Sequence, residues 1–231
     1  TVKVRMRENV IVRHFMPRTI YVRGFSFAQK GEKTMKKINV RKLTGIAMLS
    51  AVAFALQFLE FPIPIIPSFI KLDFSDLPEL IGAFAYGPAA GVIIALIKNL
   101  LHMTQSSSMY IGELSNFLMG AVLSLTAGLI YKHKKTKKGA LIASLAASLL
   151  MGIASVPINY FIVYPLYYNV LGLPEQAVLD MYKALLPSTK SIFQALLIFN
   201  LPFTVCKVLI CSVFSGIIYK PLSPLLHGKN N

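Results

Sequence analysis

The sequence predicts an all-α, polytopic membrane protein with six transmembrane helices and with both the N- and C-termini in the cytoplasm. Of the 231 residues, 55% are hydrophobic and only 14% are charged. Apolar runs long enough to cross a bilayer recur along the chain. The basic residues gather between these runs, where the positive-inside rule assigns them to the cytoplasm.

Five long apolar runs can be read directly: Leu43 to Leu59, about Ile70 to Leu101, Ile111 to Tyr131, Gly139 to about Val163, and Ser191 to Tyr219. The basic segment MKKINVRK precedes the first run and is expected inside. Five crossings would then place the basic loop Lys132–Lys138 outside, against the positive-inside rule. One run must therefore contain two crossings.

The second run divides at the sequence FAYGPAAG. Gly87 loosens the backbone, and Pro88 lacks an N–H donor but is well tolerated in the first turn of a helix. A tight turn at this pair gives two short spans, about Ile70 to Tyr86 and Pro88 to Leu101. Six crossings result, and they place the loop Lys132–Lys138 in the cytoplasm together with both termini.

The acidic residues give a check that did not enter the span count. All seven acids after Met35 fall in outer loops or near outer helix ends: Glu60, Asp73, Asp76, Glu79, Glu113, Glu175 and Asp180. Most of the basic residues that follow Met35 fall in the cytoplasmic segments. The net charge of +15 is therefore explained by topology, and nucleic-acid binding is disfavoured.

Residues 1–34 differ from the rest of the chain, with eight Lys or Arg, two Glu and no long apolar run. The segment is too polar for a signal peptide. We interpret it as a basic extension, non-native or disordered, because MKK at Met35 resembles a bacterial start; a native basic arm is the alternative. Residues 35–231 are expected to form a single six-helix transmembrane domain.

Two outer loops carry apolar residues. The first, EFPIPIIPSFIKLDFSD, has three prolines and suits a lid that lies on the protein. The last contains LPEQAVLDMYKALLPS between Pro174 and Pro187 and predicts a short amphipathic helix at the membrane interface. Its apolar face would consist of Val178, Met181, Tyr182, Leu185 and Leu186.

Motifs for catalysis are missing from the sequence. It contains no GxxxxGK[ST] phosphate loop, no GxSxG nucleophile turn and no HExxH zinc motif. Cys206 and Cys211 lie five residues apart on one predicted helix and point in different directions, so neither a disulfide nor a metal site is expected there. The chain is therefore interpreted as a binder or passive pathway, without catalytic residues or bound metal.

The last apolar run contains a polar stripe at bilayer depth. Asn200, Thr204 and Lys207 are spaced i, i+4, i+7 and share one helical face. A charged lysine within the bilayer costs about 2.5–3.5 kcal/mol on insertion scales, so Lys207 should face the bundle and have a partner. Two interpretations stay open, a ligand cavity lined by the stripe and interhelical hydrogen bonds that hold the packing.

Other polar residues in the predicted spans allow similar alternatives. Asn159, in SVPINYFIVYPLYY, can both donate and accept hydrogen bonds to a ligand, or can bind a neighbouring helix. Lys98 and Asn99 lie near the outer end of the third span and are expected to reach the interface, with a functional role as the alternative.

Small residues recur at four-residue intervals in the first span, at Ala47, Ala51 and Ala55. Such a strip lets another helix approach closely. It predicts either a docking face for a partner or internal packing against a neighbouring span.

Several stretches together resemble the S components of energy-coupling factor (ECF) transporters, specifically the riboflavin-specific ones. These are the AxxxAxxxA strip, the block DLPELIGAFAYGPAAGVIIALIKNLLH, and NYFIVYPLY with FNLPFTVCK. The resemblance covers Met35 to Lys220. It implies a bacterial multi-pass protein that captures riboflavin at the outer face and docks through its first helix onto a transmembrane coupling subunit driven by two ATPases.

The resemblance also implies ligand contacts on the fifth and sixth helices and under the first outer loop, which matches Asn159, Asn200 and Lys207. Family members often have Asn where this chain has Thr204. No cofactor is implied, since riboflavin would be the transported ligand. The alternatives are a self-sufficient secondary vitamin transporter, disfavoured by the lack of an internal repeat or a buried acid pair, and an intramembrane enzyme.

Overall fold

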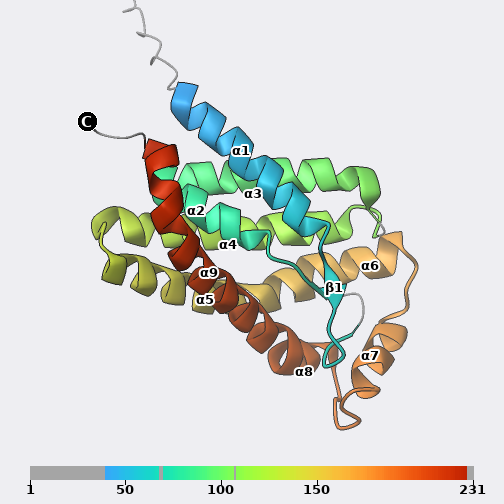
Figure 1. Ribbon diagram of the computed structural model, residues 1–231. Coiled ribbons are helices and arrows are strands. Elements are labelled where there is room, and N and C mark those ends of the chain that lie inside the picture. The colour runs from blue at the N-terminus through green and yellow to red at the C-terminus, as the bar shows by residue number, and fades with distance from the viewer. Residues whose placement is uncertain (1–39, 68–69, 107, 228–231) are drawn as a thin grey trace, which may run out of the picture. The chain divides into compact units, whose positions relative to one another are not determined.

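The computed structural model describes residues 40–67, 70–106 and 108–227, without the side chains of residues 220–227 (Figure 1). The predicted boundary between residues 34 and 35 lies outside these ranges. The elements are α1 (Val40–Gln57), β1 (Phe61–Pro62), β2 (Lys71–Leu72), α2 (Asp76–Tyr86), α3 (Pro88–His102), a 3-10 turn η1 (Met103–Gln105), α4 (Ile111–His133), α5 (Lys137–Ile158), a π-helical turn η2 (Asn159–Val163), α6 (Tyr164–Val170), α7 (Glu175–Lys183), α8 (Ile192–Ala195), a second π-helical turn η3 (Leu196–Asn200) and α9 (Leu201–His227).

The predicted helical class is confirmed. Among the described residues, four helical segments are long and apolar enough to cross a bilayer: 40–57, 111–133, 137–170 and 192–219. The helices α2 and α3 have 11 and 15 residues, fewer than the ~20 that a full crossing requires. The number of crossings therefore stays a prediction.

The predicted turn between the second and third spans is present. The helix α2 ends at Tyr86 and α3 begins at Pro88. Gly87 between them has a φ of +97°, a conformation that favours glycine because it has no Cβ. Pro88 occupies the start of α3, where its missing N–H would have had no helical partner.

The main apolar core lies where α2, α3, α4, α5 and α9 meet. These helices pack on one another, and each contributes fully buried side chains, such as Leu80, Ile94, Leu123, Ala147 and Val208. Outside this core, many large apolar residues are exposed, as expected for helices whose outer surface contacts lipid.

The connections of the bundle gather at two opposite ends. At one end Lys42 of α1 donates to the backbone oxygen of Tyr86 at 2.9 Å. The ring of Phe84 lies 4.8 Å from the ring of Tyr131 near the end of α4. The β strands, α6 and α7 lie at the other end (Figure 1). The basic turn between α4 and α5 is thus far from the hairpin of β1 and β2.

The first predicted outer loop contains a short antiparallel hairpin. Phe61 pairs with Leu72 and Pro62 with Lys71, and Lys71 forms an ion pair with Glu60. These strands were not predicted from the sequence, because proline is unfavourable inside most strands. An edge strand of two residues tolerates Pro62, since its missing donor can face away from the partner strand.

The predicted helix in the last outer loop is α7. Its buried residues are Val178, Leu179 and Tyr182, while Met181 is 42% exposed. The helix is amphipathic, as predicted, but it ends at Lys183, before Leu185 and Leu186 of the predicted face. The assignment of Tyr182 to the membrane interface is wrong. Its side chain is fully buried within the protein.

Candidate ligand-binding site

Two long helical segments change from α-helix to π-helix in the middle. The π-helical turns η2 and η3 are closed by hydrogen bonds across five residues, from Tyr164 N to Asn159 O and from Leu201 N to Leu196 O. Pro165 and Pro202 have no N–H for the carbonyls of residues 161 and 198, which are the centres of the two π turns. The prolines therefore account for the change in winding.

Each π turn carries one of the asparagines predicted to bind ligand. Asn159 is the first residue of η2, and Asn200 is the last residue of η3. Single π turns within α-helices often occur at functional sites, because they turn side chains away from the regular helical register. The two amides are thereby presented where neighbouring helices meet.

Both asparagines are buried and hydrogen-bonded. The Asn159 Nδ2 donates to the carbonyl oxygen of Ser155 at 2.8 Å. The Tyr182 hydroxyl donates to Asn200 Oδ1 at 2.7 Å, and the hydroxyls of Tyr182 and Tyr164 are 2.5 Å apart. Burial raises the pKa of Tyr182 above its ordinary value, so its hydroxyl stays neutral and can donate. We call Tyr164, Tyr182, Asn159 and Asn200 the amide–tyrosine wall.

A cavity of about 210 Å³ brings the predicted site residues together. Asn159, Asn200, Thr204 and Lys207 all line it, so the stripe on the last long helix does face one space. Further amide, aromatic and apolar lining comes from Asn116, Met119, Met151, Tyr164, Tyr167 and Phe203. We call this space the central cavity.

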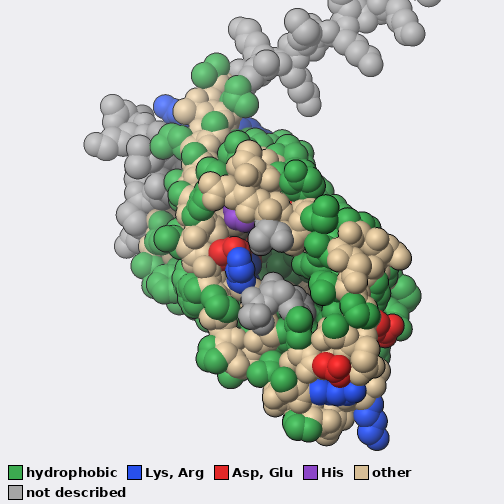
Figure 2. All heavy atoms as spheres, turned by 90° about the vertical axis from the view of Figure 1, so that its right-hand side faces the viewer, with side chains coloured by type: hydrophobic (Ala, Val, Ile, Leu, Met, Phe, Trp, Pro, Cys, Tyr) green, Lys and Arg blue, Asp and Glu red, His purple; other side chains and the backbone are tan. Residues whose placement is uncertain are grey.

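The hairpin and its flanks form another side of the central cavity. Glu60, Ile70, Lys71 and Asp73 line it from this segment. In Figure 2, acidic, basic and histidine side chains lie beside a hollow on the face that carries β1 and β2. The position of the hairpin agrees with the prediction that this loop lies on the protein.

Lys207 has two carboxylate partners. Its Nζ lies 2.9 Å from Asp73 Oδ2 and 3.1 Å from Asp76 Oδ2. The expectation that this lysine faces the bundle and is paired is thus confirmed. The identity of the partners was not predicted, because Asp73 is 134 positions away in the sequence and was assigned, with the other acids, to outer loops and helix ends.

Lys98 is also buried and paired. Its Nζ lies 2.6 Å from Glu79 Oε1 and 3.6 Å from Asp76 Oδ1, and it donates to Ser75 Oγ at 2.5 Å. The side chain is fully buried, so the expectation that Lys98 reaches the interface is wrong. Asn99 is buried as well and accepts a hydrogen bond from Gln57 Nε2 at 3.3 Å.

These residues form one group, which we call the buried charge cluster: Asp73, Asp76, Glu79, Lys98 and Lys207. It joins the loop before α2 with α2, α3 and α9. The expectation that the chain lacks a buried acid pair is wrong, because three acids are buried here. Removing one partner from such a group is costly, since the remaining charges stay in a medium that solvates them poorly.

The small-residue strip of α1 lies on the outside of this chain. Ala47, Ala51 and Ala55 are exposed, whereas the opposite face of α1 buries Leu49 and Ala53. Internal packing of the strip is therefore ruled out for the described part of the chain. Docking of a partner on it stays a prediction.

The long apolar helices, the central cavity and the hairpin define a class of protein: a helical membrane protein with a polar ligand-binding cavity beneath a loop. The model of the family "ECF transporter, substrate-specific component" matches residues 41–219. The chain belongs to this family of substrate-specific components. It is accordingly a multi-pass bacterial membrane protein that takes part in transport, and it is not an enzyme.

Two known relatives match this chain over nearly their whole length. The riboflavin transporter RibU of Staphylococcus aureus (strain TCH60) is 36% identical over 194 residues, which is 83% of this chain and 96% of that protein. The riboflavin transporter FmnP of Bacillus subtilis (strain 168) is 34% identical, covering 84% and 98%.

Among solved structures, the S component of a bacterial ECF transporter is similar with a TM-score of 0.65 and 36% identity, over 81% of this chain and 98% of that one. A structure of ThiT from Listeria monocytogenes, 17% identical with a TM-score of 0.55, shares the fold.

Proposed function

We propose that this chain is the riboflavin-capturing membrane subunit of an ATP-driven ECF importer. The observation that carries the proposal is the central cavity, which all four predicted contact residues line. The chain that forms this cavity belongs to a family of substrate-specific transporter components. Support for riboflavin comes from the two relatives described above, which are riboflavin transporters and match nearly their whole length.

The cavity lining suits the chemistry of riboflavin. The ligand has a flat, largely apolar ring with a carbonyl-bearing edge and a ribityl chain of hydroxyls. Tyr164, Tyr167 and Phe203 offer ring faces, while the amides of Asn159 and Asn200 can donate to carbonyls and accept from hydroxyls. Thr204 adds a hydroxyl where family members often have Asn.

The central cavity has to enlarge when the vitamin enters. Its volume of about 210 Å³ is below the ~300–1,000 Å³ of most small-molecule sites. The hairpin is the wall that moves in this proposal, because its strands have only two residues each and its Lys71–Glu60 ion pair lies within the hairpin and does not tie it to the helices. Outward movement of the hairpin opens the cavity, and its return covers the bound ligand.

The test of this function is whether the purified chain contains flavin. We expect a yellow, fluorescent preparation that releases riboflavin on denaturation in a one-to-one ratio. A colourless preparation that binds no added riboflavin would remove the substrate assignment and leave the fold unaffected.

For the topology we propose six crossings with both termini in the cytoplasm, α2 and α3 each forming one short span. Shelter between the other helices allows the short length of α2, whose residues 76–83 are all buried. The helix α3 keeps an exposed apolar face that includes Ile93 and Leu100, so its length requires tilt or local thinning of the bilayer. The variant Lys135→Cys tests the orientation. We expect no labelling of position 135 by an impermeant thiol reagent in intact cells, and labelling there would reverse the topology.

For the assembly we propose that Ala47, Ala51 and Ala55 dock a helix of the transmembrane coupling subunit, which two ATPases drive. The exposure of the strip supports this. In Ala51→Trp the bulky ring holds a partner helix away, so copurification and ATP-driven uptake should fall together while riboflavin binding persists. Leu149→Trp on exposed α5 is the control. Loss of binding with an intact complex would refute this docking face.

One observation favours a second candidate, a self-sufficient secondary transporter. The buried charge cluster places three acids inside the protein, and buried acids are common in ion-coupled transport. Uptake in cells without any coupling ATPase separates the two candidates. We expect none, and persistent uptake would select the secondary transporter.

A further inference from the structure

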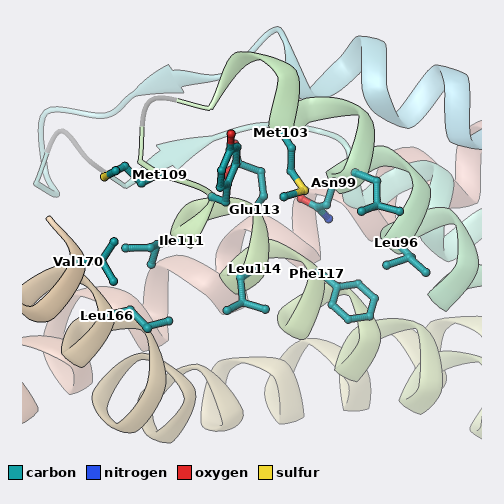
Figure 3. A pocket seen from close by; sticks show the side chains of 12 residues that line it. Leu96, Asn99, Met103, Met109, Ile111, Glu113, Leu114, Phe117, Leu166 and Val170 are labelled. Atoms are coloured by element: carbon teal, nitrogen blue, oxygen red, sulfur yellow. The ribbon is translucent and has the colours of Figure 1, made fainter.

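A second cavity opens between α3, α4 and α6 (Figure 3) and shares Glu113 with the central cavity. Its volume is about 390 Å³, within the usual range for small-molecule sites. The lining is Leu96, Asn99, Leu100, Met103, Met109, Tyr110, Ile111, Glu113, Leu114, Phe117, Leu166 and Val170. We call this space the lateral pocket.

The polar side chains of the lateral pocket are already engaged with protein partners. Glu113 accepts from Ser106 Oγ at 2.8 Å, and its other oxygen lies 2.9 Å from His102 Nδ1. Asn99 donates to the Ala95 oxygen at 2.8 Å and accepts from Gln57. These groups have little hydrogen-bonding capacity left for a ligand. The lateral pocket therefore offers mainly hydrocarbon contacts, from leucine, isoleucine, valine, methionine and phenylalanine.

The pocket is continuous with the lipid-facing surface of the bundle. Leu100 and Leu114 in its wall are 54% and 39% exposed. Further along α4, Leu125 and Leu129 continue the same kind of exposed apolar surface. Since the chain is a multi-pass membrane protein, the medium at this surface is the acyl region of the bilayer.

The residues that line the pocket differ between its end near the helix terminus and its deeper end along the membrane normal. Tyr110 and Met109 lie just before the start of α4, at the helix end, whereas Phe117 lies about two turns into the helix. Tyrosine near a helix end suits the headgroup region, because its hydroxyl can stay hydrated while its ring is in hydrocarbon. The flexible side chains of Met103 and Met109 can adapt to an occupant of irregular shape.

We propose that the lateral pocket binds one acyl chain of a bilayer phospholipid, with the headgroup near Tyr110 and the chain running toward Phe117. The occupant supports the first turns of α4 from the outside. On their other side the same turns carry Gly112, Asn116 and Met119, which line the central cavity. A bound lipid thus buttresses a wall of the ligand site without entering it.

The absence of tryptophan from the chain permits a direct test. Phe117→Trp places a single reporter in the pocket, and Leu125→Trp places one on the open surface of the same helix. Each variant, purified in detergent, is titrated with phospholipid carrying brominated acyl chains, which quench tryptophan on contact. We expect saturable quenching of Trp at position 117 at a low lipid-to-detergent ratio, and only a gradual, non-saturating decrease at position 125.

Filling the pocket sharpens the test. Adding Leu114→Phe to the Phe117→Trp variant should shift the saturation to at least several-fold higher lipid, while Leu129→Phe in the same background should not. If Phe117→Trp does not fold, Leu166→Trp on the opposite wall replaces it with the same expectation. Identical quenching curves at the pocket and surface positions would overturn the proposal, and riboflavin binding by the variants reports separately on the central cavity.

Discussion

The central cavity is bounded by two polar walls of different chemistry. The buried charge cluster contributes Asp73 and Lys207, which hold each other at 2.9 Å. The amide–tyrosine wall contributes Asn159 and Asn200, which are neutral and hydrogen-bonded to the protein. Both walls line the same space, but only one of them is made of charges that the protein itself must neutralise.

This difference between the two walls suggests two roles: the charged wall stabilises the fold, and the neutral wall recognises the ligand. Charges buried together stabilise one arrangement strongly, because each needs its counter-ion in place. Neutral amides keep unused donor and acceptor capacity that a ligand can take up at low cost. We therefore expect substitutions of cluster residues that do not line the central cavity, such as Lys98, to act first on stability, and substitutions of Asn159 and Asn200 to act first on riboflavin affinity.

The largest effect is expected for Lys98→Met. It removes the cation nearest Glu79 and leaves buried acids uncompensated, although Lys98 does not line the central cavity. We expect the free energy of unfolding to fall by about 3–5 kcal/mol, measured by thermal or denaturant unfolding in detergent. Lys183→Met is the control, because the Lys183–Asp180 pair is largely exposed and contributes at most about 1 kcal/mol. Equal stability of the two variants would contradict the role of the cluster.

A smaller effect is expected for Tyr182→Phe. The change keeps the ring in the core but removes the donor to Asn200 Oδ1, which leaves a buried acceptor unsatisfied at a cost of about 1–3 kcal/mol. Riboflavin affinity should also fall, since Asn200 loses the contact that orients it. Tyr160→Phe, on an exposed tyrosine, should change neither quantity. An unchanged affinity in Tyr182→Phe would show that the hydroxyl does not position Asn200.

Asn159→Ala should weaken riboflavin affinity more than it lowers the stability of the fold. Loss of one hydrogen bond to the ligand corresponds to about 1 kcal/mol, or roughly a fivefold weaker affinity. Titration of flavin fluorescence measures this change, and unfolding should shift little. A variant that unfolds readily but binds normally would assign Asn159 to helix packing instead.

The smallest effect is expected for Thr204→Val, which keeps the shape and removes the hydroxyl. About a twofold loss of affinity is expected from a neutral hydrogen bond at the weak end of the range, near 0.5 kcal/mol. The stability should be unchanged. Stronger binding in Thr204→Val would show that the hydroxyl faces away from the ligand.

Local patterns in the sequence predicted those features of the fold that depend only on residues close together in the chain. The apolar runs predicted the long helices, and Gly87 with Pro88 predicted the turn between α2 and α3. The spacing of Asn200, Thr204 and Lys207 predicted one shared face, because helical geometry alone determines it. These features need no knowledge of distant residues.

Features that depend on long-range contacts were missed. The partners of Lys207 come from α2 and the loop before it, and Lys98 was assigned to an interface because only its position along a helix was considered. Tyr182 has the spacing of a lipid-facing residue, yet it is buried against Tyr164 and Asn200. The π turns follow from Pro165 and Pro202. Each proline lies four residues after the centre of a π turn, and this spacing is the sequence signal from which the turns could have been predicted.

The central claim is that the central cavity is the riboflavin site. The most direct measurement is an experimental structure of the purified chain with riboflavin bound. We expect the ligand between Asn159 and Asn200, next to Thr204, with the hairpin of β1 and β2 covering it and the Lys98–Glu79 pair intact. Riboflavin bound in the lateral pocket, or anywhere that leaves both asparagines without contact, would contradict this assignment.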